Sequence, residues 1–394
     1  MSMTAAPTTL SAEERSAILD AVRDFATARL APNALDWDRR RHFPRDVLAE
    51  AGDLGLGGVY VRGDVGGSDL TRADAALIFE LLAMGDPTIA AYISIHNMVA
   101  WMIDAHGTTD QRDRWLPRLT TMQHLGAYCL TEPGAGSDAA SITTTAIASG
   151  DGYVLTGVKQ FISGAGEASV YLVMARTGEP GAQGITAFLV PADAGGLSFG
   201  PEEHKMGWNA QPTRQVIFDE VRVPASAVLG AVGGGFRLAM KGLDGGRVNI
   251  AACSLGGAQW ALDRAVRYVH ERFTFGEALA ERQSVVFALA DMATDLAAAR
   301  ALVHAAARAI DAGAPDATAQ CAMAKRFATD AGFDIANRAL QLHGGYGYLH
   351  EYGIEKVVRD LRVHQILEGT NEIMRVIIGR NVLSGTGGSA RLTA

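Results

Sequence analysis

The last third of the chain carries a regular helical pattern that restricts the possible folds more than any other feature. Between Val285 and Ile310 the apolar residues recur at alternating steps of four and three positions, without an interruption. The stretches Leu255–Phe273 and Cys321–Ile335 repeat nearly the same spacing. Such stripes are typical of long helices that pack together along one face. With the segment that carries Glu368, they predict a C-terminal four-helix bundle over residues 241–394.

The rest of the chain divides into a helical part and a β-rich part. Helical spacing runs from Ser11 to about Met122, and Ser11 followed by Glu14 predicts a capping box at the first helix. Short runs of β-branched and aromatic residues follow between Ala127 and Val223, separated by glycine and proline. We therefore expect an α+β fold, with an N-terminal α-helical domain at residues 1–125 and a middle β domain, sandwich or barrel, at residues 126–240.

The charge balance narrows the class of partner. The chain has 35 basic and 43 acidic residues, a formal net charge of −8. This balance disfavours nucleic acid or an anionic membrane surface as the main partner. The most apolar long run, Ile89–Ile103, is interrupted by His96 and Asn97 and is shorter than the roughly 20 residues of a spanning helix. It predicts a core helix, and we expect no membrane insertion.

The cysteines and the start of the chain suggest the compartment. The three cysteines are Cys129, Cys253 and Cys321, which lie far apart and do not form the close pairs of a zinc or redox site. They indicate buried thiols in a reducing environment. Glu13 and Glu14 stand where a transit peptide would avoid acidic residues. We expect a cytoplasmic protein.

Common cofactor motifs are missing from the sequence. No Gly-x-Gly-x-x-Gly follows a strand and opens a helix, and no Walker loop occurs. The histidines show no metal-binding spacing, so we expect no metal. His364 precedes Glu368 by four residues, and a packed or capping histidine is the better interpretation than a catalytic dyad.

Two glycine-containing segments admit both structural and functional interpretations. "AYCLTEPGAGSD", Ala127–Asp138, suits a tight turn between domains, or a cradle of backbone N–H groups and hydroxyls for a ring carbonyl or phosphate. "QLHGGYGY", Gln341–Tyr348, suits a helix C-cap or a second such cradle. Arg272 in "ERFTFG" suits a solvated helix end equally well. Each motif alone is weak, and their order along the chain is the specific feature.

That order resembles the acyl-CoA dehydrogenase family over nearly the whole chain. The matching motifs are "YCLTEPGAGSD", "FISGAG", "ERFTFG", "QLHGGYGY" and "ILEGTNEI". The longer strings "AYISIHNMVAWMID" and "GWNAQPTR" resemble the isobutyryl-specific branch of the family. The resemblance implies FAD as cofactor, an acyl-CoA substrate, an electron-transfer flavoprotein as electron acceptor and a homotetramer.

The resemblance also implies roles for individual residues. FAD would be held within one subunit by Tyr128, Leu130, Thr131, Ser137, Phe161, Ile162 and Ser163. Many family members carry Trp where Phe161 stands, so the stacking contact is smaller here. The FAD of a neighbouring subunit would be reached by Arg272, Phe275, Gln283, Gln341, Gly344 and Gly345, and closed over by Thr370 and Glu372. The substrate would be bound by Ser137, Asp244, Arg247, Gly369 and Arg380.

Glu368 is the residue expected to carry the chemistry. Removal of a proton next to a thioester carbonyl needs a base within hydrogen-bond reach, and a carboxylate in an apolar segment gains basicity from desolvation. A structural ion pair is the alternative interpretation. Some family members place the base just before the arginine of "LDGGR", but here Gly246 occupies that position.

The sequence therefore predicts the α,β-dehydrogenation of a short branched acyl-CoA, namely isobutyryl-CoA to methacrylyl-CoA as in valine breakdown. Two related alternatives stay open, a dehydrogenase for straight short chains and an acyl-CoA oxidase. A non-catalytic binding protein on the same fold is disfavoured because Glu368 and the polar residues of the FAD loop are present.

Overall fold

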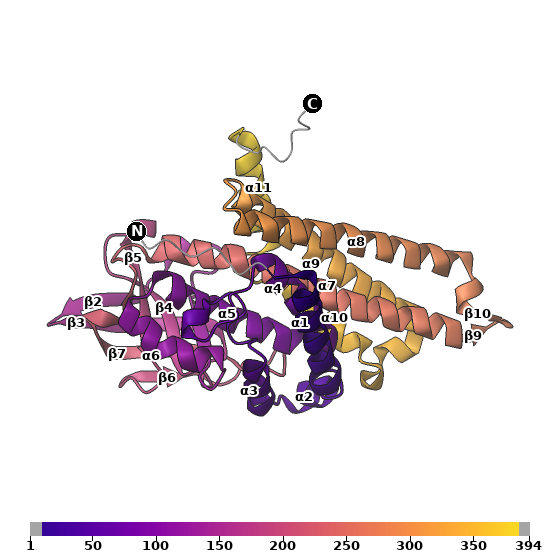
Figure 1. Cartoon of the computed structure of the whole chain (residues 1–394), viewed down its shortest axis with the longest axis horizontal. Helices are drawn as coiled ribbons and strands as arrows, with labels where there is room; N and C mark the ends of the chain where they lie inside the picture. The colour runs from indigo at the N-terminus through magenta and orange to yellow at the C-terminus, as the bar shows by residue number, and fades with distance from the viewer. Residues whose placement is uncertain (1–9, 386–394) are drawn as a thin grey trace.

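The computed structural model describes residues 10–385. Figure 1 shows most strands gathered at one end of the molecule, while the longest helices run to the opposite end, where two short strands lie, and several N-terminal helices lie near the middle. The helix–strand–helix order expected from the sequence is confirmed.

Six α-helices lie in the described N-terminal part, from residue 10 onward. Their bounds are α1 (Ala12–Phe25), α2 (Ala34–Arg40), α3 (Arg45–Asp53), α4 (Arg72–Gly85), α5 (Pro87–His106) and α6 (Thr109–Thr120), and a π-helical turn at Ala26–Leu30 continues α1. The capping box of Ser11 and Glu14 is present at α1. The sequence patterns did not single out α2, a helix of two turns.

Helix α5 is buried along nearly its whole length, as its apolar sequence predicts. Its two polar interruptions bond to the backbone of neighbouring segments. Asn97 Oδ1 accepts from the Val59 N–H at 2.7 Å, and His96 Nε2 lies 2.9 Å from the Leu119 carbonyl oxygen. Between residues 10 and 385, no helix is long and apolar enough to cross a membrane.

The middle part is one connected sheet. Its strands are β1 (Gly126–Cys129), β2 (Thr145–Ser149), β3 (Gly152–Ser163), β4 (Val170–Arg176), β5 (Ile185–Pro191), β6 (Leu197–Phe199), β7 (Thr213–Pro224) and β8 (Val228–Leu229). They follow the order β6-β7-β3-β2-β4-β5-β8, and β1 pairs in parallel with β4. The outer strands β6 and β8 do not pair with each other, but the two halves of the sheet face each other: Tyr153 of β3 packs on Phe188 of β5, and Tyr171 of β4 packs on Phe199 of β6. The expected middle β domain is confirmed.

Three long helices dominate the C-terminal part. The elements are α7 (Gly235–Glu271), α8 (Gln283–Asp311), α9 (Ala317–His343), α10 (Ile354–His364) and α11 (Asn371–Leu383), with a hairpin of β9 (Phe273–Thr274) and β10 (Glu277–Ala278) between α7 and α8. The expected fourth helix of the bundle is divided into α10 and α11, and Glu368 lies in the break. The domain boundary expected at residue 240 falls inside α7.

Helix α7 connects the two ends of the molecule. Its 37 residues span about 55 Å at the usual rise of an α-helix. At its start, a side chain on Gly235 would meet the backbone of Thr186 in β5 at 2.6 Å, so the helix begins directly on the sheet. Its other end leads to the β9–β10 hairpin at the far end of the bundle (Figure 1).

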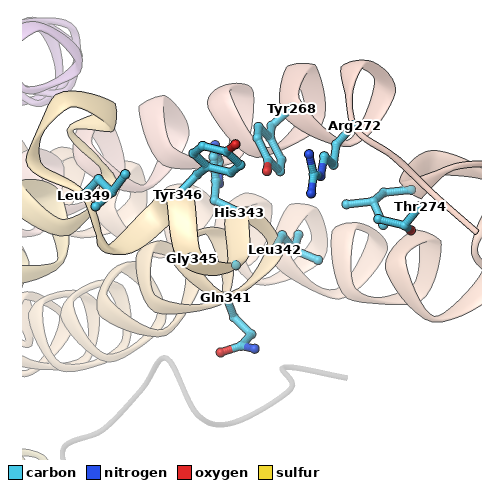
Figure 2. A pocket seen from close by; sticks show the side chains of 11 residues that line it. Tyr268, Arg272, Thr274, Gln341, Leu342, His343, Gly345, Tyr346 and Leu349 are labelled. Carbon is cyan, nitrogen blue, oxygen red and sulfur yellow. The ribbon is translucent and has the colours of Figure 1, made fainter.

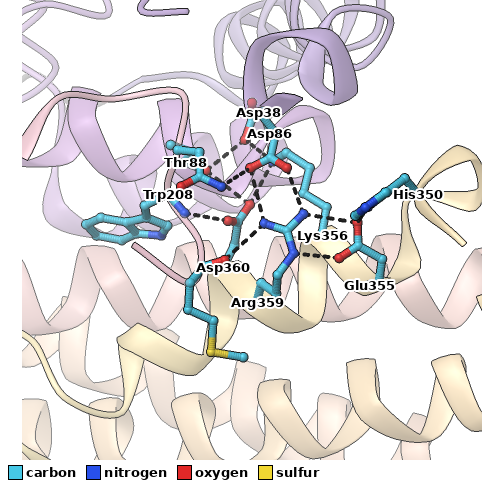
Figure 3. Close-up of polar contacts among 11 residues, drawn as sticks. Asp38, Asp86, Thr88, Trp208, His350, Glu355, Lys356, Arg359 and Asp360 are labelled. Atoms are coloured by element: carbon cyan, nitrogen blue, oxygen red, sulfur yellow. Dashed lines mark hydrogen bonds and ion pairs between the residues drawn. The ribbon is translucent and has the colours of Figure 1, made fainter. Parts of the chain in front are cut away.

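A buried group of charges joins all three parts of the chain (Figure 3). We call Asp86, Thr88, Trp208, Lys356 and Asp360 the junction cluster. The Lys356 ammonium lies 3.0 Å from Asp86 Oδ1 and 2.7 Å from Asp360 Oδ2. Asp360 also accepts hydrogen bonds from the Thr88 hydroxyl at 3.0 Å and from the backbone N–H of Trp208 at 2.7 Å. The cluster fixes α10, and with it the start of the segment that leads to Glu368.

Candidate active site

Glu368 lies in a turn between two helices rather than within one. We call residues 365–370 the Glu368 turn. Glu368 has φ +56° and Gly369 has φ +90°, so two successive residues are in the left-handed region, which non-glycine residues rarely adopt. The turn ends at Thr370, whose hydroxyl accepts from the Ile373 N–H at 3.3 Å and caps α11.

The Glu368 side chain is partly exposed, and one oxygen of its carboxyl group is buried. Among the described residues, no hydrogen-bond partner reaches this oxygen, Oε2. Burial raises its pKa to about 7, against the opposing charges of Arg247 and Lys325. A carboxyl group in this state can exchange a proton near neutral pH, as a general base must.

Gly246 of α7 faces this carboxyl group. A side chain at Gly246 would begin 2.5 Å from Glu368 Oε2 and 3.1 Å from Oε1, so only glycine fits without moving the carboxylate. The sequence position where some family members carry the base therefore lies beside Glu368 in space. In this chain it supplies room instead of a second carboxylate.

Arg247 and Asp244 form a pair beside the Glu368 turn. The two side chains bond at 2.7 Å, and Asp244 also accepts from the Thr318 hydroxyl at 2.6 Å. Arg247 Nε donates to the backbone carbonyl of Glu368 at 3.2 Å. Both residues were expected to bind substrate, and the structure places them in contact with each other and with the backbone of the turn.

Lys325 is a site residue that the sequence analysis missed. Its side chain is fully buried on α9, and its ammonium donates to the Gly369 carbonyl at 2.8 Å and to Asn371 Oδ1 at 3.0 Å. Burial lowers its pKa to about 7, with Glu368 opposing that shift. The only signal in the sequence was a lysine directly after Ala324, a member of the apolar stripe of α9.

Aromatic side chains lie near the same carboxyl group. The Tyr128 hydroxyl is buried and has no partner within residues 10–385, and its pKa is raised by burial and by the charge of Glu368. Tyr60 lies under the Arg72 guanidinium, at 3.6 Å from its ring centre, and its hydroxyl accepts from Asn249 at 3.0 Å. Tyr128 was expected here, whereas Tyr60, Arg72 and Asn249 had no local sequence signal.

The loop expected to cradle FAD, within Ala127–Asp138, is held in place by a buried ion pair. Lys159 lies 2.7 Å from Glu132 Oε1 and donates to the Leu130 carbonyl at 3.0 Å. Burial would raise the pKa of Glu132, but the charge of Lys159 and hydrogen bonds from Thr143 and Thr144 lower it to about 2. The Gln160 N–H donates to the Thr131 carbonyl at 2.8 Å, which joins the loop to β3.

The same loop is open on its outer side. Added side chains at Gly134 and Gly136 would meet no atom within 4 Å, and Ser137 is exposed. Phe161 follows on β3 with φ +59° and an exposed fraction of 63%, at an irregularity of the β3–β7 pairing. An exposed aromatic ring in strained backbone beside an open glycine cradle fits a flat ring cofactor with a phosphate group.

The remaining residues of this segment are less exposed. Ile162 is buried, and Ser163 Oγ accepts from the Gln211 amide at 3.3 Å. The structure therefore brings together the β-domain residues that the motif resemblance assigned to FAD.

A second group of expected cofactor residues meets elsewhere. Arg272, Gln341, Gly344 and Gly345 line a pocket of about 490 Å³ (Figure 2). The Arg272 guanidinium lies 5.6 Å from the ring centre of Tyr346, which also lines the pocket. This pocket lies at the end of α7, a helix length away from the sheet, so one cofactor cannot contact both groups within one chain.

The other residues expected to bind FAD or substrate lie outside both the β-domain loop and the Arg272 pocket. Phe275 is 97% exposed on the β9–β10 hairpin, and Gln283 is exposed at the start of α8. Glu372 is exposed in the first turn of α11, next to Thr370. Arg380 is exposed in the last turn of α11 and lies apart from the Glu368 turn.

Comparisons with known proteins agree with this fold. Family models describe the N-terminal domain of acyl-CoA dehydrogenases at residues 12–123, the middle domain at residues 127–221 and the C-terminal domain at residues 233–383. The chain therefore belongs to the acyl-CoA dehydrogenase family, whose members are flavin-dependent oxidoreductases. The family expected from the motifs is confirmed.

Individual relatives cover nearly the whole chain. Mitochondrial isobutyryl-CoA dehydrogenase from Bos taurus is 51% identical over 371 residues, 94% of this chain and 89% of the relative. The structure of butyryl-CoA dehydrogenase from Megasphaera elsdenii has a TM-score of 0.92 and 37% identity, covering 95% of this chain and 99% of the other. A glutaryl-CoA dehydrogenase from Mycobacterium smegmatis in complex with FADH2 has a TM-score of 0.89 and 29% identity, covering 95% of each chain.

Proposed function

We infer that the protein uses FAD to oxidise a short branched acyl-CoA, isobutyryl-CoA to methacrylyl-CoA, with Glu368 as the base. The observation that carries this proposal is the Glu368 carboxyl group, which has a buried, unbonded oxygen and faces the space left by Gly246. Its pKa of about 7 suits a general base at neutral pH.

In this proposal, the protein's own side chains remove one proton from the substrate and hold the base that accepts it. Glu368 takes the proton from the carbon next to the thioester carbonyl, and Arg247 and Lys325 hold the backbone that carries the carboxylate. The flavin, when bound, supplies an acceptor for the hydride from the neighbouring carbon. The residues that would hold it in the same subunit are those of the open loop and of β3, with Tyr128 on the inner side.

The second half of the cofactor site would come from another subunit. Because the Arg272 pocket lies a helix length from the sheet, the proposal requires a homo-oligomer, and the family resemblance specifies a homotetramer. Arg272→Ala is expected to weaken FAD retention, measured by flavin content after gel filtration. A monomer that holds FAD tightly and in full would contradict shared sites.

The substrate preference rests on the relatives and on α5. The 51% identical relative is named for isobutyryl-CoA. Tyr92 and Ile93 of α5 are fully buried, and the Tyr92 ring lies 2.7 Å from where a side chain on Gly164 would begin, directly after the Phe161–Ser163 segment. Bulky side chains here would end the acyl pocket soon after the branched carbon.

The test is an anaerobic titration of the purified flavoprotein with isobutyryl-, 2-methylbutyryl-, butyryl- and octanoyl-CoA, followed by flavin absorbance. We expect isobutyryl-CoA to lead, with discrimination of about 10- to 200-fold in kcat/KM. Butyryl- or octanoyl-CoA in first place would reject the branched substrate and favour the straight-chain alternative. Rapid hydrogen peroxide formation in air would favour an acyl-CoA oxidase.

An electron-transfer flavoprotein is the proposed acceptor, since an acyl-CoA dehydrogenase must pass its electrons on after each turnover. Its addition should restore flavin absorbance after substrate reduction. The cytoplasmic location expected from the sequence stays a prediction, which cell fractionation tests.

A further inference from the structure

Lys325 is buried in a way that the other two fully buried lysines are not. Lys159 and Lys356 each lie 2.7 Å from a carboxylate oxygen. Within residues 10–385, no carboxylate oxygen comes within 4.0 Å of the Lys325 ammonium, which bonds to two neutral oxygens, those of Gly369 and Asn371. A buried charge without a counter-ion is costly, so its presence here calls for a specific explanation.

Both acceptors belong to the segment that presents Glu368. The Gly369 carbonyl directly follows Glu368 in the chain, and Asn371 is the first residue of α11. The Asn371 amide in turn donates to Thr329 at 3.0 Å and to Asp330 at 2.7 Å, so the contact is fixed to the next turn of α9.

Two cations hold two successive carbonyl groups of the Glu368 turn. Arg247 donates to the carbonyl of Glu368, and Lys325 donates to the carbonyl of Gly369. Both residues of the turn have positive φ, a conformation that costs free energy at Glu368 and needs external support. The carboxylate itself receives no bond from either cation, so its oxygens stay available to a proton.

We propose that Lys325 is a positioning residue for the dehydrogenation, which holds the left-handed Glu368 turn through the Gly369 carbonyl and favours the ionised form of Glu368 by its charge. This inference rests on the proposed role of Glu368 as the base.

The charged and titratable groups around the pair define its electrostatics. Arg247, Lys325, Tyr60 and Tyr128 act on Glu368, and Arg247 and Lys325 lower its proton affinity. Asp330, Glu372 and Glu368 favour the charge of Lys325, while Arg247 opposes it. The neighbouring His364 is buried, with its pKa lowered to about 3, so it stays neutral. Removal of the Lys325 charge therefore leaves Arg247 as the one cation acting on Glu368 in the described structure.

The sign of the pH effect follows directly. Glu368 must be deprotonated to act as the base, so flavin reduction rises with pH through its pKa. Without the Lys325 charge the pKa of Glu368 rises, and the acid limb of the profile moves to higher pH. We expect a shift of about 1 pH unit, the lower end of the effect of a nearby opposite charge.

The experiment compares Lys325→Met, which loses the bond and the charge, with Lys325→Gln, which keeps an amide donor but no charge. Stopped-flow flavin reduction by isobutyryl-CoA is measured against pH in the holoenzyme. Both variants should show the shifted acid limb, and Lys325→Met should also lose at least about 10-fold in limiting rate through misplacement of the base. Lys241→Met, an exposed lysine on α7, is the charge-matched control and should show neither change.

A second readout does not depend on catalysis. The infrared carboxyl band that disappears in Glu368→Gln is titrated without substrate, and its midpoint should rise in both Lys325 variants. Unshifted limbs and midpoints in Lys325→Gln would overturn the proposal, even if the rate fell uniformly. Full flavin reduction by Glu368→Gln would instead reject the proposed base, while the infrared titration would still decide the effect of Lys325 on Glu368.

Discussion

The junction cluster and the Glu368 turn each place a carboxylate near a buried lysine, but the two groups are arranged differently. In the junction cluster, Lys356 bonds directly to Asp86 and Asp360. At the Glu368 turn, Glu368 and Lys325 of the adjacent α9 act on each other's charge without a direct bond, and Lys325 bonds to a backbone carbonyl instead. The two regions are neighbours along the chain, since α10 connects them.

The difference in bonding separates a structural charge from a reactive one. Although burial opposes its charge, the carboxylates of Asp360 and Asp86 raise the pKa of Lys356, so this lysine keeps its proton. Burial moves the pKa values of Glu368 and Lys325 toward each other, to about 7 for both. Direct pairing thus fixes a charge, whereas separation by a carbonyl group leaves a proton that can be exchanged at neutral pH.

The largest effect should come from Glu368→Gln, which removes basicity at nearly constant size. We expect the rate of flavin reduction by acyl-CoA to fall by about 10²- to 10⁴-fold, the usual contribution of a general base. Thermal stability should not fall, because the substitution removes a partly buried carboxylate without a bonded counter-ion. Glu351→Gln, on an exposed residue, is the control. An unchanged rate of flavin reduction would show that Glu368 is not the base.

A substitution in the junction cluster should lower the stability of the protein and leave the pH dependence of flavin reduction unchanged. Lys356→Met leaves Asp86 and Asp360 buried without their cation, and breaking such a pair costs about 3–5 kcal/mol of unfolding free energy. Chemical denaturation measures the loss, with Lys241→Met as the control. The acid limb of flavin reduction in the remaining folded protein should stay in place. A shifted limb with unchanged stability would show that the two regions had been assigned the wrong way round.

The smallest expected effect tests the space around the base. Gly246→Ala adds a methyl group where Glu368 Oε2 lies 2.5 Å away, so the carboxylate must move. A displacement of this kind is expected to lower the limiting rate by about 10- to 100-fold, with little change in stability. Gly379→Ala, a helical glycine with open space around it, is the matched control. Equal rates in the two variants would mean that Glu368 does not need its observed position.

Local patterns in the sequence were sufficient for most of the fold. The capping box at Ser11, the buried helix α5 and the regular stripe of α8 were all predicted, because each depends on residues close in sequence. The domain boundary was placed at residue 240, although α7 already begins at Gly235. The strand order of the sheet was not predicted, because it depends on contacts that no short segment encodes.

The site was predictable where it involves a single motif and not where it involves distant partners. Glu368 stood out as a carboxylate in an apolar segment that ends in a break. Lys325 bonds to Gly369 across 44 positions of sequence, and nothing near either residue indicates that contact. The left-handed backbone of Phe161 and Glu368 was likewise invisible, since both residue types usually avoid it.

The junction cluster also restricts when the molecule can fold during synthesis. Asp86 leaves the ribosome 270 residues before Lys356, and Trp208 leaves it 152 residues before Asp360. Domains that fold as they emerge usually complete their cores from the N-terminus onward. Here the first helices cannot bury Asp86 at low cost until nearly the whole chain has been made. The junction cluster is therefore completed only once α10 has been made, whereas other contacts between the parts, such as that of Asn249 with Tyr60, can form earlier.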